Sequence, residues 1–119
     1  MLPKKNRPNK KIIEQIFSKG RFVNSPNLSF KFIKVDKTED KKASFVTPKV
    51  VSKQAVVRNM LRRRGYLALG RHFDSFPAGF YGIFLFGKKS GAIFGGKKTK
   101  LHDGYLNLEK EIEIILNKL

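Results

Sequence analysis

A seven-residue segment, Phe80–Phe86, is apolar at almost every position and is bounded by glycines. Such a run is typical of a strand that is buried on both faces of a sheet, so it needs other elements packed on each side. The chain has 119 residues, 40% of them apolar, which is enough for one modest core. We therefore expect a single domain, residues 1–119, built around this strand.

The sequence before this segment predicts one helix and three short strands. Apolar residues recur at helical spacing over 10–19, where Asn9 is a suitable N-cap and Gly20 a suitable stop. After that, apolar and polar side chains alternate as a half-buried strand requires. The expected strands are residues 21–24, 28–35 and 43–47.

Two further helices complete the pattern. Residues 52–73 form the longest helical candidate, with Ser52 as a possible cap and a weak point or end near Gly70. An amphipathic helix closes the chain, with Asn107 as its cap. The expected fold class is α/β, more fully an α+β sandwich. A small mixed sheet of about four strands packs with three helices in the order α-β-β-β-α-β-α.

Two basic segments lie outside these elements. Residues 1–9 contain Pro3 and Pro8 and are expected to form an extended N-terminal arm, whose cations are Lys4, Lys5 and Arg7. Residues 87–104 contain five glycines and are expected to form a mobile basic loop. Its lysines are Lys88, Lys89, Lys97, Lys98 and Lys100.

The charge balance points to a polyanionic partner. Lys and Arg number 26 against nine carboxylates, a formal charge of +17 that repels itself unless a polyanion neutralises it. Nucleic acid is favoured over a membrane surface, because the N-terminus offers neither a basic amphipathic helix nor a lipidation signal. The chain has no cysteine, no apolar run of membrane-spanning length and no secretory signal, so we expect it in the cytoplasm.

The candidate binding residues lie on the long helix. On a helical wheel, Val56, Val57, Met60, Leu61, Leu67 and Ala68 share one side, whereas Arg58, Asn59, Arg62, Arg63 and Tyr66 share the other. Arginine can grip two phosphate oxygens, and Asn59 can contact a sugar or base or orient an arginine. Arg64 projects toward the apolar side and must extend to solvent. Because this helix contains no carboxylate, its outer side favours a nucleic-acid interface over a solvated surface.

At residues 53–64 the sequence Lys-Gln-Ala-Val-Val-Arg-Asn-Met-Leu-Arg-Arg-Arg resembles the arginine-asparagine-arginine signature of the bacterial ribonuclease P protein subunit. Residues 2–7 and the stretch from Phe17 to Leu28 are also similar to that family's opening. The resemblance implies a protein that binds a large catalytic RNA and helps it to remove 5′ leaders from precursor tRNA. It also implies a left-handed βαβ crossover, and Mg²⁺ that is used by the RNA rather than held by the protein.

The resemblance assigns roles to particular residues. Arg58, Asn59, Arg62 and Arg63 would contact the catalytic RNA, with Lys49 and Lys53 beside them. A cleft between the first helix and the sheet would receive the single-stranded leader, and its residues here would be Lys10, Ile13, Phe17 and Lys31. The chain departs from the family where Ile13 and Lys31 replace frequent aromatic residues, in a longer 47–54 segment, at Arg64-Gly65-Tyr66 and in the longer 87–104 loop.

Other interpretations are weaker but stay open. A generic basic RNA-binding module, ribosome-associated or chaperone-like, would explain the charge without an enzymatic role. An autonomous nuclease would need converging carboxylates, whereas Glu109, Glu111 and Glu113 are expected to be solvated charges. His72 with Asp74, or His102 with Asp103, forms no convincing metal site. Residues 91–98 approach a phosphate-binding P-loop, but Lys98 replaces its hydroxyl residue.

Overall fold

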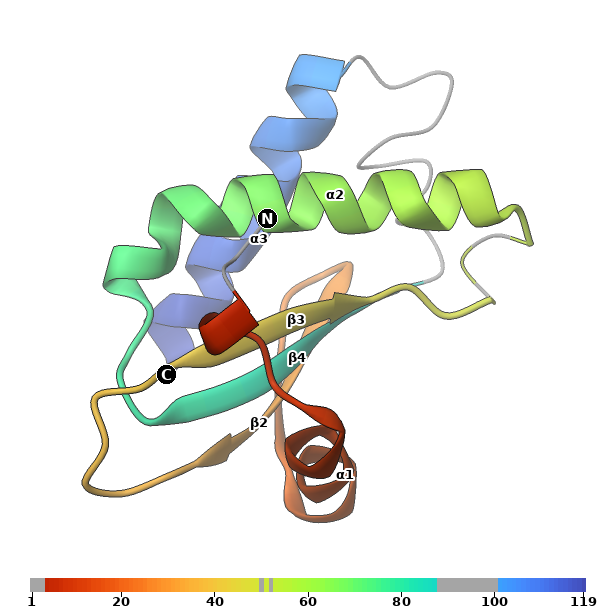
Figure 1. The fold of residues 1–119 in the computed structure, drawn as a ribbon. Helices are drawn as coiled ribbons and strands as arrows, with labels where there is room; N and C mark the ends of the chain where they lie inside the picture. The colour runs from red at the N-terminus through yellow and green to blue at the C-terminus, as the bar shows by residue number, and fades with distance from the viewer. Residues whose placement is uncertain (1–3, 50, 52, 88–100) are drawn as a thin grey trace.

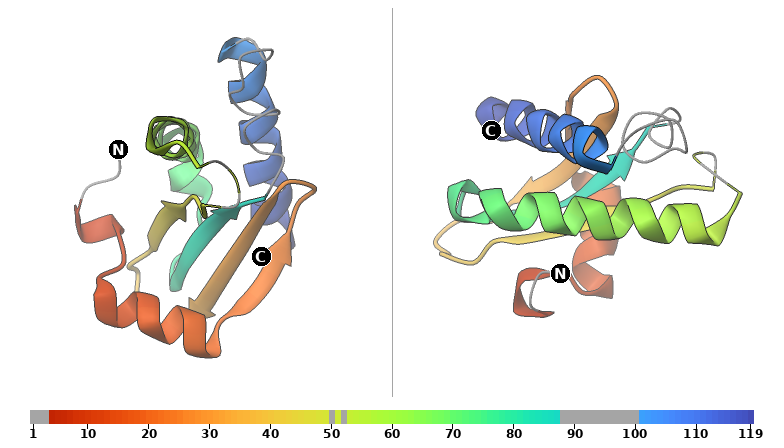
Figure 2. Two further views of the ribbon diagram at one scale, coloured as in Figure 1. Left: turned by 90° about the vertical axis from the view of Figure 1, so that its right-hand side faces the viewer. Right: turned by 90° about the horizontal axis from the view of Figure 1, so that it is seen from above.

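The computed structural model describes residues 4–49, 51, 53–87 and 101–119. A four-stranded mixed sheet forms its middle layer, with two helices on one face and one on the other (Figure 1; Figure 2, left). The element order and the expected α+β architecture are confirmed. In chain order the elements are η1 (Lys4–Asn6), α1 (Lys10–Lys19), β1 (Arg21–Asn24), β2 (Leu28–Lys34), β3 (Lys42–Val46), α2 (Ala55–His72), η2 (Phe73–Ser75), β4 (Phe80–Phe86) and α3 (Leu101–Lys118).

Helix α1 begins and ends where the sequence predicts. The Asn9 side-chain oxygen accepts a hydrogen bond from the Ile12 backbone N–H at 2.9 Å, so Asn9 is the N-cap. At the other end, the Gly20 N–H donates to the Ile16 carbonyl at 2.8 Å. Ile16 is fully buried, and α1 contacts β2 and β4. The helix therefore covers the sheet face opposite α2 and α3.

The expected central strand is β4, which has strands on both sides. The sheet order is β1-β2-β4-β3, with β4 antiparallel to β2 and parallel to β3. Phe84 of β4 is in register with Phe30 of β2 and Phe45 of β3, with ring centroids 4.4 and 4.8 Å away. This row of three rings is the middle of the core between the sheet and the two helices.

The connection from β3 through α2 to β4 is left-handed. Viewed from the helix side with both strands running to the right, β4 lies above β3 in the picture (Figure 2, right). A right-handed crossover would place β4 below β3 in that view. The handedness that the family resemblance implied is therefore confirmed.

Helix α2 approaches the sheet closely because of one glycine. A Cβ atom on Gly65 would lie 2.6 Å from the Phe45 ring, so a larger residue would push the helix away. Gly65 is flanked on the same stripe by buried Leu61, Ala68 and Leu69. This spacing gives α2 a narrow contact stripe over β3.

Three expectations for this helix are wrong. It begins at Ala55 rather than at 52; Ser52 lies outside the described residues, and Gln54 is an N-cap that makes no side-chain hydrogen bond. Val56 and Leu67, predicted in the core, are 76% and 60% exposed. The reason is that the contact stripe through Gly65 is narrower than the apolar side of the wheel. The helix also continues through Gly70 to His72.

Helix α3 begins earlier than predicted. It starts at Leu101, so Asn107 lies inside it and is not its cap. Positions 101, 105 and 108 extend the apolar spacing of the C-terminal residues, and burial of Leu108, Ile112 and Ile115 outweighs the cost of about 1 kcal/mol for Gly104 in a helix. Residues 101–104 of the expected basic loop are therefore helical. Its lysines, Lys88, Lys89, Lys97, Lys98 and Lys100, lie outside the described residues.

Glu111 is a buried structural residue, not the solvated charge that the sequence suggested. It is 6% exposed, and its carboxylate accepts hydrogen bonds from the Ser25 hydroxyl and the Asn27 N–H, both at 2.6 Å, and from Asn27 Nδ2 at 3.2 Å. These donors lie in the turn between β1 and β2, where the Ser25 hydroxyl also lies 3.1 Å from the Leu28 carbonyl, and a carboxylate can accept all three. Glu111 thereby joins α3 to the turn.

In the described part of the N-terminal arm, residues 4–6 are folded against the sheet rather than extended. These residues form the short helix η1, which contacts the edge strand β3. Asn6 Nδ2 donates to the Lys41 carbonyl at 3.3 Å, and Lys42 Nζ donates to the Lys5 carbonyl at 2.5 Å. The first bond satisfies a carbonyl beside the edge strand that would otherwise face water, and the second joins a side chain of the edge strand to η1. In the described part of the chain, no helix is long and apolar enough to cross a membrane.

Candidate nucleic-acid interface

The outer side of α2 presents most of the residues predicted to bind RNA. Asn59, Arg62 and Arg63 are exposed, and Arg58 is partly buried. The helix contains five arginines and no carboxylate. Because like charges repel at this spacing, an anion that neutralises them stabilises the surface.

Asn59 orients an arginine, which is one of the roles that the sequence analysis predicted for it. Its side-chain oxygen accepts a hydrogen bond from Arg62 Nη2, one helical turn further along. A guanidinium carries more donors than this bond uses, and so Arg62 keeps donors for a second acceptor. The pair is therefore partly ordered, with guanidinium donors left for a further acceptor.

Arg58 has a structural role that the sequence did not reveal. Its Nη1 donates to the Lys53 carbonyl at 3.1 Å, and its own carbonyl accepts from the Thr47 hydroxyl at 3.3 Å. Arg58 thus ties the start of α2 to the segment before it. Lys49 and Lys53, the two further predicted contacts, are exposed in that segment.

Arg64 lies on the inner side of α2, as the wheel predicted, and is partly exposed. Desolvation by burial lowers the pKa of its guanidinium below the usual value. The group stays charged at neutral pH, since arginine is protonated throughout that range.

A groove joins the α2 surface to the N-terminal segment. It has a volume of about 550 Å³ and is lined by Arg7, Phe45, Val56, Asn59, Arg62, Arg63 and Tyr66. A second hollow of about 450 Å³ shares Arg7 and Tyr66 with it and adds Pro8, Asn9, Lys42 and Ser44. Arg7, a predicted arm residue, therefore lines the same groove as the exposed residues of α2. Of the other two, Lys4 and Lys5 lie in η1, and Lys5 is exposed.

Tyr66 lines both of these hollows. The wheel placed it on the binding side, but its ring packs edge-on against Phe45 with the centroids 5.3 Å apart. Its hydroxyl oxygen accepts a hydrogen bond from the Phe45 N–H at 3.3 Å. Tyr66 is therefore partly a packing residue, which a wheel alone cannot indicate.

The residues predicted for the leader cleft lie on one flank of α1 and on β2. Lys10, Ile13 and Phe17 follow an i, i+3, i+7 spacing; Lys10 and Phe17 are exposed and Ile13 is partly buried. Lys31 Nζ donates to the Phe17 carbonyl at 2.9 Å and lies 5.5 Å from the centre of its ring. The structure thus brings Phe17 and Lys31 together. It adds Phe22 of β1, which the sequence analysis missed, with its ring centre 5.0 Å from Lys31 Nζ.

The other flank of α1 borders a separate hollow of about 590 Å³. Gln15 and Lys19 contribute from the helix, and the remaining lining residues are Arg21, Phe32, Ile33, Lys34, Asp36 and Phe80. Gln15 and Lys19 point away from Phe17, because residues two apart on a helix lie on different sides. The predicted leader residues therefore lie outside this hollow.

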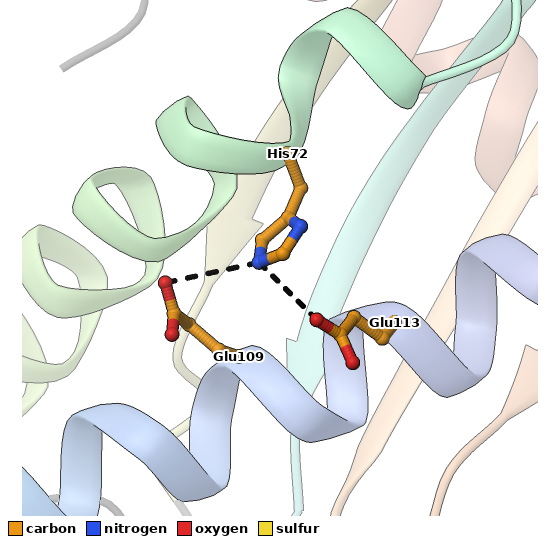
Figure 3. Close-up of polar contacts among 3 residues, drawn as sticks. All are labelled: His72, Glu109 and Glu113. Atoms are coloured by element: carbon orange, nitrogen blue, oxygen red, sulfur yellow. Dashed lines mark ion pairs between the residues drawn. The ribbon is translucent and has the colours of Figure 1, made fainter.

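His72, which the sequence paired with Asp74, faces the carboxylates of α3. Its Nε2 lies 3.7 Å from Glu109 and 3.8 Å from Glu113 (Figure 3). Among the described residues, no group of three or more His, Cys, Asp or Glu is placed to hold a metal ion. We interpret this contact as a link between the end of α2 and the middle of α3.

The comparisons with known proteins agree on one family. The family model described as Ribonuclease P matches residues 2–118. The RNase P protein of Thermotoga maritima is similar in structure, with a TM-score of 0.78 at 18% identity, over 95% of this chain and 96% of that one. An RNase P protein structure from Staphylococcus aureus has a TM-score of 0.72 at 15% identity, over 98% and 95%. A comparison with curated sequences gave no match.

Proposed function

The chain belongs to the Ribonuclease P protein family, and from that premise we propose that it binds the catalytic RNA of ribonuclease P together with the 5′ leader of precursor tRNA. In this role it supports the endonucleolytic removal of the leader during tRNA 5′ maturation. Ribonuclease P would then be a ribonucleoprotein endonuclease of the cytoplasm, with this chain as its protein subunit.

The observation that carries the proposal is the surface of α2. Arg62 and Arg63 are exposed on a helix without carboxylates, and Arg7 extends this surface across the groove to the N-terminal segment. Arginine forks match pairs of phosphate oxygens, and Asn59 adds an amide that can reach a sugar hydroxyl or a base edge. An RNA backbone offers these acceptors in a repeating array. The surface is therefore suited to a folded RNA.

In this proposal the protein neutralises charge and the RNA performs the chemistry. Mg²⁺ takes oxygen ligands such as carboxylates, whereas the proposed interface consists of guanidinium groups, ammonium groups and one amide. These residues do not fit the ion, so we assign Mg²⁺ to the RNA partner. Cations of the protein would lower the repulsion between the catalytic RNA and the precursor tRNA, which otherwise requires more Mg²⁺.

We assign the leader to the exposed flank of α1. Phe17 offers an aromatic face with Lys31 beside it, and Lys10 is an exposed cation about two turns earlier on the same flank of the helix. Unpaired bases stack on aromatic faces while cations hold the backbone, so this flank suits a single strand. Ile13 offers no aromatic face, and stacking at that position is accordingly weaker.

The decisive experiment is cleavage of a precursor tRNA at low Mg²⁺ by the cognate catalytic RNA. It is run with RNA alone, with protein alone and with both. Cleavage only when both are present supports the proposal. An unchanged rate with protein points instead to a generic basic RNA-binding module, and cleavage by the protein alone would reveal an autonomous nuclease.

A further inference from the structure

Two hollows beside β3 share two lining residues and differ in the chemistry of the rest of their lining. Arg7 and Tyr66 line both, so the groove of about 550 Å³ along α2 and the hollow of about 450 Å³ along the N-terminal segment adjoin each other. The groove adds an apolar side chain, a phenylalanine ring and an amide, whereas the hollow adds a lysine and a serine. Together they suit a ligand that has an apolar part and an anionic part.

The groove has the lining that an unpaired base requires. Val56 is 76% exposed, and Phe45 contributes an aromatic ring beside it. The oxygen of Asn59 accepts from Arg62, which leaves its amide nitrogen to donate to a ring nitrogen or carbonyl of a base. One exposed valine is common on protein surfaces, but here it shares a groove with a ring and an amide. Pockets that take single bases combine these same groups.

The adjoining hollow contains a hydroxyl that the fold does not use. Ser44 Oγ is buried and makes no hydrogen bond with any residue in the described part of the chain. Lys42 Nζ donates to the Lys5 carbonyl and the Tyr66 hydroxyl accepts from the Phe45 N–H, so both groups keep protons to donate. A buried polar group without a partner is unfavourable, and a ligand that bonds to it removes that cost. A phosphate has enough acceptor oxygens for all three donors.

From this arrangement we propose that the groove and the hollow form a site for one unpaired nucleotide, with its base in the groove and its phosphate in the hollow. Arg7 lines both parts, and a guanidinium can bond to a phosphate or stack on a base. The net charge of +17 favours a nucleotide over a neutral nucleoside. An unpaired nucleotide of the RNA partner and a free nucleotide offer the same chemistry. The first source rests on the proposed function, and the nucleotide site itself does not.

The first test is an NMR titration of the full-length protein with adenosine 5′-monophosphate (AMP) at constant ionic strength. Saturable shifts of the backbone signals of Val56 and Ser44 are the expected result. Adenosine and ribose 5-phosphate carry the two parts of the probe separately, and each should bind at least about tenfold more weakly than AMP. Ribose 5-phosphate that binds as tightly as AMP would overturn the site, since the base would then contribute nothing.

Ser44→Ala tests the phosphate position and separates binding from folding. The hydroxyl has no partner in the fold, so its removal should leave the free energy of unfolding unchanged or raise it. Binding of AMP should weaken by about fivefold to twentyfold, because the phosphate loses a donor. Ser75→Ala removes an exposed hydroxyl at a different hollow and is the matched control, which should bind as the parent does. Parental affinity for AMP in the Ser44→Ala variant would overturn the proposal.

Val56→Thr tests the base position. It keeps the shape of the side chain and replaces one methyl group by a hydroxyl, and because Val56 is exposed the fold should not change. Affinity for AMP should fall by about threefold to fivefold, whereas affinity for ribose 5-phosphate should stay the same. Equal losses for the two probes would contradict a base in the groove.

The cognate catalytic RNA distinguishes the two sources of the nucleotide. If the RNA supplies it, saturation with this RNA should displace AMP, and Ser44→Ala should weaken RNA binding by a factor similar to that for AMP. AMP that binds equally well to the ribonucleoprotein identifies a free nucleotide as the ligand.

The cleavage assay separates the site from the proposed function. AMP binding with the expected effects of both variants, but without stimulated cleavage, keeps the nucleotide site and rejects the ribonuclease P role. Stimulated cleavage by a protein whose Val56 and Ser44 signals do not change with AMP overturns the nucleotide site alone.

Discussion

At the scale of single residues, Arg62 and Arg63 are the best side chains with which to test the RNA interface. Both are exposed on α2, whereas Arg58 also holds the start of the helix through the Lys53 carbonyl. A change at Arg58 would therefore mix binding with stability. Arg62→Ala and Arg63→Ala remove cations while leaving the contact stripe of the helix intact.

We expect the Arg62→Ala, Arg63→Ala double variant to bind the catalytic RNA at least about tenfold more weakly than the parent. Each lost phosphate contact should also reduce the slope of log affinity against log salt by about 1. Filter binding over a salt series measures both quantities. Arg71→Ala removes the same kind of charge from the exposed far end of α2 and is the matched control.

Binding of random RNA of equal length shows whether the double variant has lost specific or general affinity for RNA. A specific interface loses more affinity for the catalytic RNA than for random RNA. Equal losses of affinity for both RNAs would mean that α2 is a generic cationic surface. An Arg71→Ala variant that binds as weakly as the double variant would mean the same.

At the scale of elements, two glycines of α2 make opposite predictions. A Cβ on Gly65 would meet the Phe45 ring at 2.6 Å, whereas a Cβ on Gly70 would meet nothing within 4 Å. Gly65→Ala should therefore destabilise the fold by about 1–3 kcal/mol through overpacking. Gly70→Ala should stabilise it by about 0.5–1 kcal/mol, since alanine favours the helix. Urea unfolding of both variants measures the change in the free energy of unfolding. If both variants are stabilised, or both destabilised, α2 does not pack on β3 as described.

The carboxylate of Glu111 is the second element-scale test. It satisfies three donors of the β1–β2 turn, and glutamine offers one acceptor oxygen in place of two. Glu111→Gln should lower the free energy of unfolding by about 1–3 kcal/mol. Glu14→Gln removes the same charge from an exposed site on α1 and should change it by less than about 0.5 kcal/mol. A similar loss in both variants would mean that net charge, rather than the turn, is responsible.

Local signals were enough to predict α1, the strand order along the chain and the arginine side of α2. Asn9 and Gly20 make their capping hydrogen bonds with residues at most four positions away. The apolar composition of Phe80–Phe86 by itself indicates a buried strand. These features depend on the nearby chain, which the sequence displays directly. That is why the predicted boundaries of α1 and β4 agree with the structure.

Features that depend on distant partners could not be predicted in the same way. Val56 is exposed because of where Gly65 meets Phe45, and Glu111 is buried because of donors that lie 84 and 86 residues away in the sequence. Phe22 joined the candidate site only when strand register placed it opposite Lys31. Handedness of the crossover came from the family resemblance, because elementary rules favour the opposite hand.

At the scale of the whole molecule, the net charge of +17 opposes folding of the isolated protein. The positive charges are closer together in the folded state than in the unfolded chain, so their mutual repulsion costs more there. Screening by salt reduces that cost, and a bound polyanion removes it. The same charges that favour RNA binding should therefore limit the stability of the free chain.

We accordingly expect two opposite responses to one salt series. Raising NaCl from about 20 mM to about 500 mM shortens the screening length from about 20 Å to about 4 Å, so the Tm of the free protein should rise. Affinity for RNA should fall steeply over the same range, because released counterions drive binding. Thermal unfolding followed by circular dichroism, beside filter binding in matched buffers, measures both. A Tm that does not change with salt would mean that the excess charge is already compensated within the fold. An affinity that does not change with salt would contradict phosphate contacts as the basis of binding.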